Sequence, residues 1–448
     1  MPGAGVTLHV LVRRVVESML TTAAGIYRVD AMKMSREQRD LALLTGADAG
    51  EMLRIVLAKR GGKLRSWSVH AQHHRPGAGV SVGYSVIVDA LPAAAARNSN
   101  RVGTFRTDRY LVASTEKVNE ARLQRTGGAT LTCGPTRVHV WEHPNDPRLP
   151  ALRLACDPNL LSEFLGQPVE IELLGYRPTR RAVVRIIGEH HNWYAKVVRP
   201  VQLAELRTRL QLLQRSAVPA PQIVDRDERG FLVMTPVAGV PLSRLYADSR
   251  LGDERLVPAL RSLEQTLDDL PLAARGLPQR PAWVDRCEHY AGAAAVVLPA
   301  EEQRCVKVAQ NIRELLAQAD LGPIVPTHGD FYEANVYVDL GSGLVQGLLD
   351  VDGLGPGYRV HDWACLLGHM AVLPGLSPKK YAHIPEILAD WTSRLGSRVD
   401  PIALSASTAG VVLSLVAGTR RHNRQDWQSQ AISRLEIAEE WVARGFSC

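Results

Sequence analysis

The chain of 448 residues contains 46% hydrophobic and 22% charged residues, which is typical of a soluble globular protein with two or three domains. Its net charge is +7, but Lys and Arg are scattered and aromatic residues make up only 5%; this argues against a nucleic-acid groove and suits an anionic ligand such as a nucleotide. The six cysteines are dispersed without a Cys-x-x-Cys pair, which favours ordinary reduced thiols over a disulfide framework or a zinc site.

The N-terminal stretch "MPGAGVTLHVLVRRVVESML" is interrupted by two arginines and lacks the layout of a signal peptide. We find no apolar run long enough to cross a bilayer, so we expect a cytoplasmic protein with no membrane partner. Residues 1–46 carry no motif. We expect this stretch to be disordered or to precede the true start, with Met19, Met32 and Met34 as alternative start positions.

The next part of the chain is predicted to be a β-rich N-terminal module, residues 47–165. It opens with a short helix over 49–60, with Asp48 as its cap. Alternating apolar residues then predict four strands, at 67–74, 80–90, 109–114 and 136–143. The polar stretch 93–108 predicts a loop, and "DPNLLSEFLG" predicts a second helix.

A second β-rich block covers residues 166–240. It contains three predicted strands, at 169–178, 181–188 and 192–200. A helix at 201–216 follows, and "GFLVMTPVAGVPL" is predicted to be a buried strand that runs into a linker. This block and the module share Arg-Pro, three residues, an apolar strand and then a strand opened by Tyr. A tandem repeat and a chance similarity both explain this, and a repeat would place Val112 where the second block has Lys196.

Residues 241–448 are predicted to be mostly helical, with one embedded hairpin. The resulting order is β-rich, β-rich, then helical. We therefore predict an α+β fold in which a small β-rich lobe and a larger helical lobe enclose a cleft, with the additional β-rich module before them.

The embedded hairpin contains the segments "HGDFYEAN" (328–335) and "LLDVDGLGPGYRVHDWA" (348–364). A turn at "DLGSG" would bring Asn335, ahead of the first strand, near Asp350 at the end of the second. Amide and carboxylate oxygens are the ligands that Mg²⁺ prefers. Asp330, five residues before Asn335, would face the group that attacks a metal-bound phosphate, as phosphoryl transfer requires. An ordinary polar turn explains either segment alone.

Together, the two segments resemble the paired signature of the aminoglycoside phosphotransferase and choline kinase family, which is similar in fold to protein kinases. That pattern is His-Gly-Asp, four residues and Asn, then an apolar-Asp pair, a Gly-rich loop and an Asp that opens a helix. The sequence meets each fixed position, at His328, Gly329, Asp330, Asn335, Asp350, Gly355, Gly357 and Asp362. The resemblance covers residues 166–448.

The resemblance implies roles for the residues of this motif. Asp330 would be the catalytic base or would orient the acceptor hydroxyl. Asn335 and Asp350 would hold Mg²⁺, and Asp352 would either assist a second metal ion or solvate the loop. His328 would brace the loop by hydrogen bonds, and the final Asp of the motif would be the N-cap of the following helix.

The resemblance also implies a nucleotide site on the small lobe. Lys196, in mid-strand, would bind the α- and β-phosphates, and Glu205 would be its helical partner, although the family position falls nearer Arg209. No glycine-rich loop is present; in its place "GYRPTRR" offers Arg181 and two further arginines that would contact phosphate or lie exposed in a turn. Met234 begins the linker beside which the nucleotide base would lie.

The sequence thus predicts a Mg²⁺-dependent kinase that transfers the γ-phosphate of ATP or GTP to a hydroxyl of an aminoglycoside-, sugar- or amino-alcohol-like acceptor. The acceptor, any protein partner and the oligomeric state cannot be read from the sequence. The alternative is a non-catalytic, nucleotide-binding regulator that uses the N-terminal module to hold a protein partner. The unusual phosphate loop favours the regulator, whereas the intact Asp330, Asn335 and Asp350 favour the enzyme.

Overall fold

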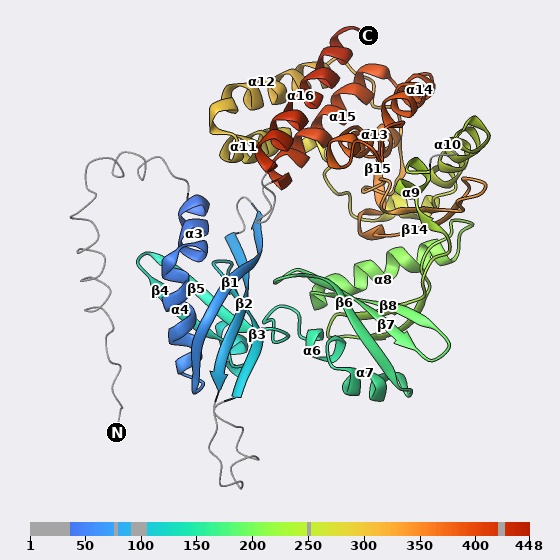
Figure 1. Ribbon diagram of the computed structural model, residues 1–448. Helices are drawn as coiled ribbons and strands as arrows, with labels where there is room; N and C mark the ends of the chain where they lie inside the picture. Colours follow the sequence, from blue (N-terminus) through green and yellow to red (C-terminus); the bar gives the residue numbers. More distant parts are fainter. Residues whose placement is uncertain (1–35, 76–78, 91–104, 249–251, 420–425) are drawn as a thin grey trace.

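The computed structural model describes residues 36–75, 79–90, 105–248, 252–419 and 426–448. Two β-sheets lie side by side, and a helical lobe lies over one end of the second sheet (Figure 1). The expected α+β arrangement, a β-rich module followed by a β-rich lobe and a larger helical lobe, is confirmed.

The N-terminal module is a five-stranded antiparallel sheet in the order β1-β2-β3-β5-β4, with two helices packed on one face. Alternate residues of β2 from Val80 to Val88 are all buried, which is the period of two that a half-buried strand requires. Its elements are α3 (Arg36–Thr45), α4 (Ala47–Ala58), β1 (Gly62–Arg75), β2 (Gly79–Ala90), β3 (Phe105–Ser114), α5 (Glu120–Arg125), β4 (Ala129–Cys133) and β5 (Thr136–Glu142).

Helix α3 and strand β4 were not anticipated from the sequence. Residues 1–35, which form most of the N-terminal stretch without a motif, lie outside the described residues, whereas 36–45 form α3 and bury Leu44 in the core of the module. Most of the predicted loop, residues 93–104, also lies outside the described residues, and β3 begins within the rest of it.

The small lobe is a second five-stranded antiparallel sheet, in the order β6-β7-β8-β10-β9. Its elements are α6 (Leu152–Ala155), α7 (Pro158–Leu165), β6 (Val169–Arg177), β7 (Arg181–Gly188), β8 (Asn192–Val198), α8 (Pro200–Gln214), β9 (Ile223–Asp227) and β10 (Phe231–Met234). Helices α6 and α7 share a buried cluster with this sheet, whereas the sequence placed them in the module that ends at 165. Helix α6 contacts β8 and α7 contacts β6, which places both helices in the small lobe.

The two sheets have the same topology. In each, three meandering strands are followed by a helix and two strands, and the last strand lies beside the third. Val112 on β3 pairs with Gly83 and Trp141, and Lys196 on β8 pairs with Val183 and Leu232. The two residues therefore hold equivalent places in the two sheets, as the tandem repeat predicts.

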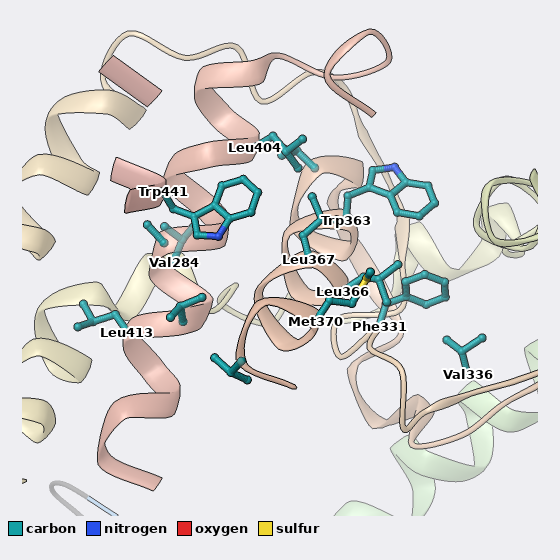
Figure 2. Packing of buried hydrophobic residues seen from close by; sticks show 14 of the residues in the cluster. Val284, Phe331, Val336, Trp363, Leu366, Leu367, Met370, Leu404, Leu413 and Trp441 are labelled. Carbon is teal, nitrogen blue, oxygen red and sulfur yellow. The ribbon is translucent and has the colours of Figure 1, made fainter. Parts of the chain in front are cut away.

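The large lobe is mainly helical. Its helices are α9 (Leu242–Tyr246), α10 (Asp253–Asp268), α11 (Cys287–Val297), α12 (Glu302–Leu316), α13 (Arg359–Leu376), α14 (Ile384–Gly396), α15 (Pro401–Val416) and α16 (Trp427–Phe446). Figure 2 shows its core, in which Phe331 of the motif packs edge to face on Trp363 of α13, with ring centroids 5.9 Å apart. The first motif segment is therefore anchored to the core through the residue next to Asp330.

Helix α15 corrects one expectation. Among the described residues, Pro401–Thr419 is long and apolar enough by composition to cross a membrane, contrary to our expectation that no such run is present. However, 72% of its most apolar window is buried inside the protein, against α11, α12, α13 and α16. A core helix surrounded by other helices needs apolar residues on all its faces, which accounts for this composition.

Two small sheets carry the motif segments. The first joins β11 (Val240–Pro241), β13 (Val336–Val338) and β14 (Val345–Leu348), and the second pairs β12 (Ile324–Thr327) with β15 (Gly355–Tyr358). The predicted Gly-rich loop is thus partly a strand. Gly357 is needed there because a Cβ atom would lie 2.6 Å from Oγ1 of Thr327 on β12.

Candidate active site

The β13–β14 hairpin brings the two motif segments together. Val336 pairs with Leu348, and the Leu349 N–H donates to the Asn335 carbonyl oxygen at 2.8 Å. Asn335 and Asp350 therefore lie next to the two strands at the same open end of the hairpin, opposite its turn, as the short turn predicts. Asp350 itself has a left-handed φ of 53°, an uncommon conformation for a residue other than glycine.

The backbone of the candidate catalytic loop, residues 328–335, is held by Asp362. Its side chain is fully buried, and its two carboxylate oxygens accept the N–H groups of His328 at 3.1 Å and Gly329 at 2.9 Å. The expectation that Asp362 is a helix N-cap is wrong, because α13 already begins at Arg359. Asp362 instead fixes the loop that carries Asp330.

His328 braces the same loop. Its Nε2 lies 3.0 Å from the carbonyl oxygen of Leu349, which can only accept, so Nε2 carries the proton. Nδ1 is then free to accept the N–H of Asp330, at 3.3 Å. Burial lowers the pKa of His328 and keeps the ring neutral. The ring thereby joins the catalytic loop to the residue before Asp350.

The two loops approach each other so closely that glycine is required on both sides. A Cβ atom at Gly329, whose φ is +80°, would lie 2.9 Å from the carbonyl oxygen of Gly353, and one at Gly353 would lie 2.7 Å from that of His328. The Gly of the His-Gly-Asp motif therefore has a steric reason in this chain.

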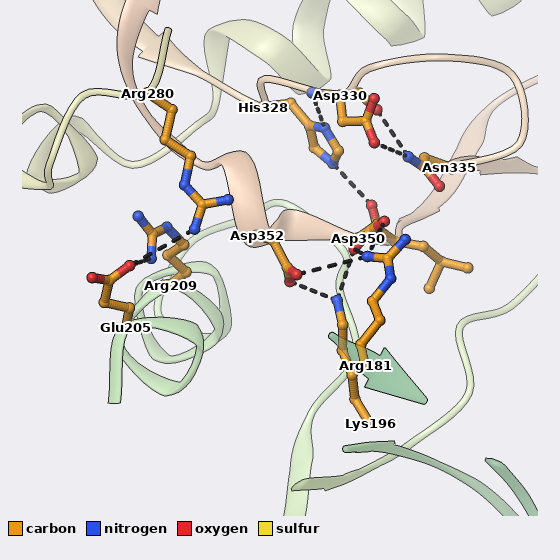
Figure 3. A network of polar contacts seen from close by, with 11 residues as sticks. Arg181, Lys196, Glu205, Arg209, Arg280, His328, Asp330, Asn335, Asp350 and Asp352 are labelled. Carbon is orange, nitrogen blue, oxygen red and sulfur yellow. Dashed lines mark hydrogen bonds and ion pairs between the residues drawn. The ribbon is translucent and has the colours of Figure 1, made fainter. Parts of the chain in front are cut away.

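Asp330 lies at the edge of this loop, with Asn335 beside it (Figure 3). The Asn335 Nδ2 donates to the Asp330 carbonyl oxygen at 2.9 Å and to its Oδ2 at 3.4 Å. Burial, and then the nearby charge of Asp350, raise the pKa of Asp330 to about 7. A carboxyl group with this pKa is matched to accepting a proton near neutral pH.

Lys196 and Arg181 of the small lobe reach across to the carboxylates of the large lobe (Figure 3). Lys196 Nζ lies 2.7 Å from Asp350 Oδ1 and 2.6 Å from Asp352 Oδ1. Arg181 Nη1 lies 3.1 Å and 3.0 Å from the two Asp350 oxygens. Burial alone would raise the pKa of Asp350, but the charges of Lys196 and Arg181 outweigh it and hold this pKa well below its usual range.

These residues line one cavity of about 250 Å³ between the two lobes. Its wall contains six of the eight residues singled out from the sequence, namely Arg181, Lys196, Met234, Asn335, Asp350 and Asp352. The linker residues Thr235 to Val237 and the apolar Leu206 and Leu210 of α8 complete it. The end with cations and carboxylates matches the phosphates of a nucleotide, and the apolar end beside the linker matches its base.

The donor set at the polar end fits a magnesium ion. The amide oxygen of Asn335 and the carboxylates of Asp350 and Asp352 are hard oxygen donors of the kind that Mg²⁺ takes together with phosphate and water. Both Asp350 oxygens now accept hydrogen bonds from Lys196 and Arg181, so a metal ion would exchange places with these cations.

Glu205 does not pair with Lys196. Its carboxylate is 52% exposed and lies 3.1 Å from Arg209 and 3.7 Å from Arg280. Arg209, one turn further along α8, lies beside Glu205 (Figure 3) and has a buried side chain. Its Nε donates to the Leu354 carbonyl oxygen at 2.9 Å. The sequence analysis placed the family's glutamate nearer Arg209 than Glu205. It gave no reason to expect that a cation at this place would bind the backbone.

Residues 174–383 match the model of the phosphotransferase enzyme family. No curated protein matches the chain. Many solved structures are similar to it, and three of them illustrate the match. The aminoglycoside phosphotransferase APH(4)-Ia, in complex with ADP and hygromycin B, is 13% identical, with a TM-score of 0.45, over 64% of this chain and 98% of that one.

The second structure, the spectinomycin phosphotransferase APH(9)-Ia with ADP and spectinomycin, is 14% identical, with a TM-score of 0.45, over 64% of this chain and 99% of that one. The third, APH(3'')-Id from Streptomyces rimosus, is 21% identical, with a TM-score of 0.37, over 57% and 98%. The match to the phosphotransferase enzyme family model covers Lys196, the linker and both motif segments.

Proposed function

We propose that this protein is a Mg²⁺-dependent kinase that transfers the γ-phosphate of ATP or GTP to a hydroxyl group of a small molecule. The observation that carries the proposal is the placement of Asp330 beside Asn335 on one loop, while Asn335, Asp350, Asp352 and Lys196 line one interlobe cavity. Positioning and charge stabilisation supply most of the catalysis of phosphoryl transfer, and these residues offer both.

Each residue of the site has a distinct task in this proposal. Lys196 and Arg181 bind the phosphates of the nucleotide, which frees the Asp350 carboxylate that they now hold. Asn335, Asp350 and Asp352 hold the magnesium ion, which neutralises charge on the phosphates when it is bound.

Asp330 accepts the proton of the acceptor hydroxyl and orients that hydroxyl toward the phosphorus. Its raised pKa, of about 7, lets the carboxylate take up a proton at neutral pH. The loop that carries Asp330 is held by His328 and Asp362, so its carboxylate is positioned before the substrate binds.

The acceptor is proposed to be an alcohol of the aminoglycoside, sugar or amino-alcohol type. The match of residues 174–383 to the phosphotransferase enzyme family model supports this class without selecting one acceptor. The non-catalytic alternative is disfavoured, because a regulator needs no carboxylate held beside the metal ligands by two buried side chains, His328 and Asp362.

The test is transfer of labelled γ-phosphate from ATP, and separately from GTP, to pooled aminoglycosides, sugars and amino alcohols. Asp330→Asn should reduce turnover by about 10²-fold or more, because loss of a positioned base typically costs 10²- to 10⁴-fold, and it should leave nucleotide binding within about threefold of wild type. Asp390→Asn, in an exposed pair with Arg394, is the matched control. Transfer by Asp330→Asn at the wild-type rate would refute the proposed role of this residue.

A further inference from the structure

The turn between β6 and β7 occupies the place of a phosphate loop but differs from one in its burial. Its tip, Thr179, is fully buried and has a left-handed φ of 63°. Such a conformation is unfavourable for a residue other than glycine, so the surroundings must hold it. A loop that only covers phosphates would be expected to leave its tip in solvent.

All three polar groups of Thr179 are bound. Its N–H donates to Asp146 Oδ2 at 2.7 Å and its hydroxyl donates to Glu116 Oε2 at 3.0 Å. Its carbonyl oxygen accepts from Arg199 Nε at 2.7 Å. Glu116 follows β3 and Asp146 follows β5, so both carboxylates come from the N-terminal module rather than from the small lobe.

The carboxylate of Asp146 is itself fixed. It is 2% exposed and also accepts the hydroxyl of Tyr176 at 2.7 Å and the N–H of Arg148 at 2.8 Å. Tyr176, at the end of β6, accepts in turn from Trp141 Nε1 at 3.1 Å, and Trp141 lies on β5 of the module. The module therefore holds the turn both at its tip and at its first strand.

The other end of the same turn faces the candidate active site. Arg181 begins β7, two residues after Thr179, and its guanidinium contacts Asp350 at 3.0 Å. A shift of the tip would move Arg181, because the two residues are joined by a single residue. The turn lacks the glycines that would let its two ends move independently.

We propose that the N-terminal module positions the phosphate loop: Asp146 and Glu116 hold Thr179 so that Arg181 stands at the phosphate subsite before the nucleotide binds. The inference rests on the proposed nucleotide site and goes beyond it by giving the module a task. Asp146, Glu116 and Thr179 are positioning residues, since none of them lines the interlobe cavity.

The test compares Thr179→Val, which removes the hydroxyl at similar size, with Thr179→Ser, which retains it. In the full chain, Thr179→Val should weaken Mg²⁺-ATP binding by about fivefold to tenfold and raise its KM, while kcat stays within about threefold of wild type. The reason is that a less ordered turn must be ordered when the nucleotide binds, which lowers affinity more than the rate of the chemical step. Thr179→Ser should restore binding to within about threefold of wild type. Hydrogen exchange of residues 175–183 should be faster in Thr179→Val than in wild type.

Thr392→Val, which removes another buried hydroxyl, in the large lobe, is the matched control for stability. Glu116→Gln is the second variant. It keeps an acceptor for Thr179 but loses the charge beside Arg148 and Arg199, and it should weaken nucleotide binding in the same direction. Wild-type nucleotide affinity in both Thr179→Val and Glu116→Gln would overturn the positioning role and leave the proposed function intact. Absence of nucleotide binding by the wild type would overturn both.

Discussion

At the scale of single residues, the site depends on groups that are buried and fully bonded. Asp362 is the clearest case, because its two oxygens receive the N–H groups of His328 and Gly329 and it is 0% exposed. Asp330 gains its position from these contacts without touching Asp362 directly. The order of the candidate catalytic loop therefore depends on the hydrogen bonds that its backbone donates to Asp362.

Replacing Asp362 with Asn should destabilise the protein and reduce activity together. One acceptor becomes an N–H donor that faces a backbone N–H, and an unsatisfied buried group costs about 1–3 kcal/mol. Urea unfolding should show a lower free energy of unfolding by that amount. Asp390→Asn, in an exposed pair, should change it by about 0.5 kcal/mol or less. Equal free energies of unfolding for the two variants would show that the hydrogen bonds of Asp362 do not stabilise this loop.

At the scale of elements, α8 connects the small lobe to the segment that follows Asp350 in an unexpected way. Arg209 donates to the carbonyl oxygen of Leu354, which directly follows the short helix η5 (Val351–Gly353). Glu205 on the same helix is half-exposed and contacts only arginines among the described partners. The helix therefore supports the Asp350 segment through a backbone contact instead of orienting Lys196 through an ion pair.

Substitutions on α8 distinguish these two roles. Glu205→Gln should leave the Kd for Mg²⁺-nucleotide within about twofold of wild type, because an exposed ion pair contributes about 0–1 kcal/mol. Arg209→Gln should lower the free energy of unfolding by about 1–3 kcal/mol, because it leaves the Leu354 carbonyl unpaired in the interior. Arg207→Gln, whose partner Glu228 is exposed, is the control. Calorimetric titration and denaturant unfolding measure the two quantities, and a large loss of affinity in Glu205→Gln would restore the role that the sequence indicated.

The same contrast explains which parts of the site the sequence could predict. Asp330, Asn335 and Asp350 lie on one loop and one hairpin, whose short turn fixes their relation locally. The hold of Asp362 on the catalytic loop joins residues more than thirty positions apart, and that of Asp146 on Thr179 likewise crosses between sheets. Contacts of this kind depend on how whole elements pack, which no local pattern in the chain records.

At the scale of the whole molecule, two sheets of the same topology have different partners. The second sheet carries Lys196 and faces the large lobe, whereas the first has Val112 at the equivalent place and holds the turn of the second. Without the cation, the first sheet has no group at that place for a phosphate. Its polar contacts serve its neighbour, which is consistent with the positioning role proposed above.

The ion pairs between the lobes lead to a prediction about binding order. In this structure Lys196 and Arg181 occupy the Asp350 and Asp352 carboxylates, which are the proposed metal ligands. Mg²⁺ alone would have to displace two cations, whereas a nucleotide takes Lys196 and Arg181 onto its phosphates and frees the carboxylates. Nucleotide and Mg²⁺ should therefore bind synergistically, each strengthening the other by about 5- to 150-fold, the usual range of coupling between linked sites.

Thermal unfolding measures this coupling in the intact protein, because a ligand at 100 times its Kd adds about 2.7 kcal/mol to the free energy of unfolding. Mg²⁺ alone should leave Tm nearly unchanged, ATP with EDTA should raise it slightly, and the two together should raise it by more than the sum. Lys196→Met should lose the synergy. In this variant one of the cations that compete with Mg²⁺ for Asp350 is missing, and the nucleotide has lost one of its phosphate-binding partners. A Tm increase with Mg²⁺ alone as large as with Mg²⁺-ATP would mean that the carboxylates already stand open to metal and that the interlobe ion pairs do not gate the site.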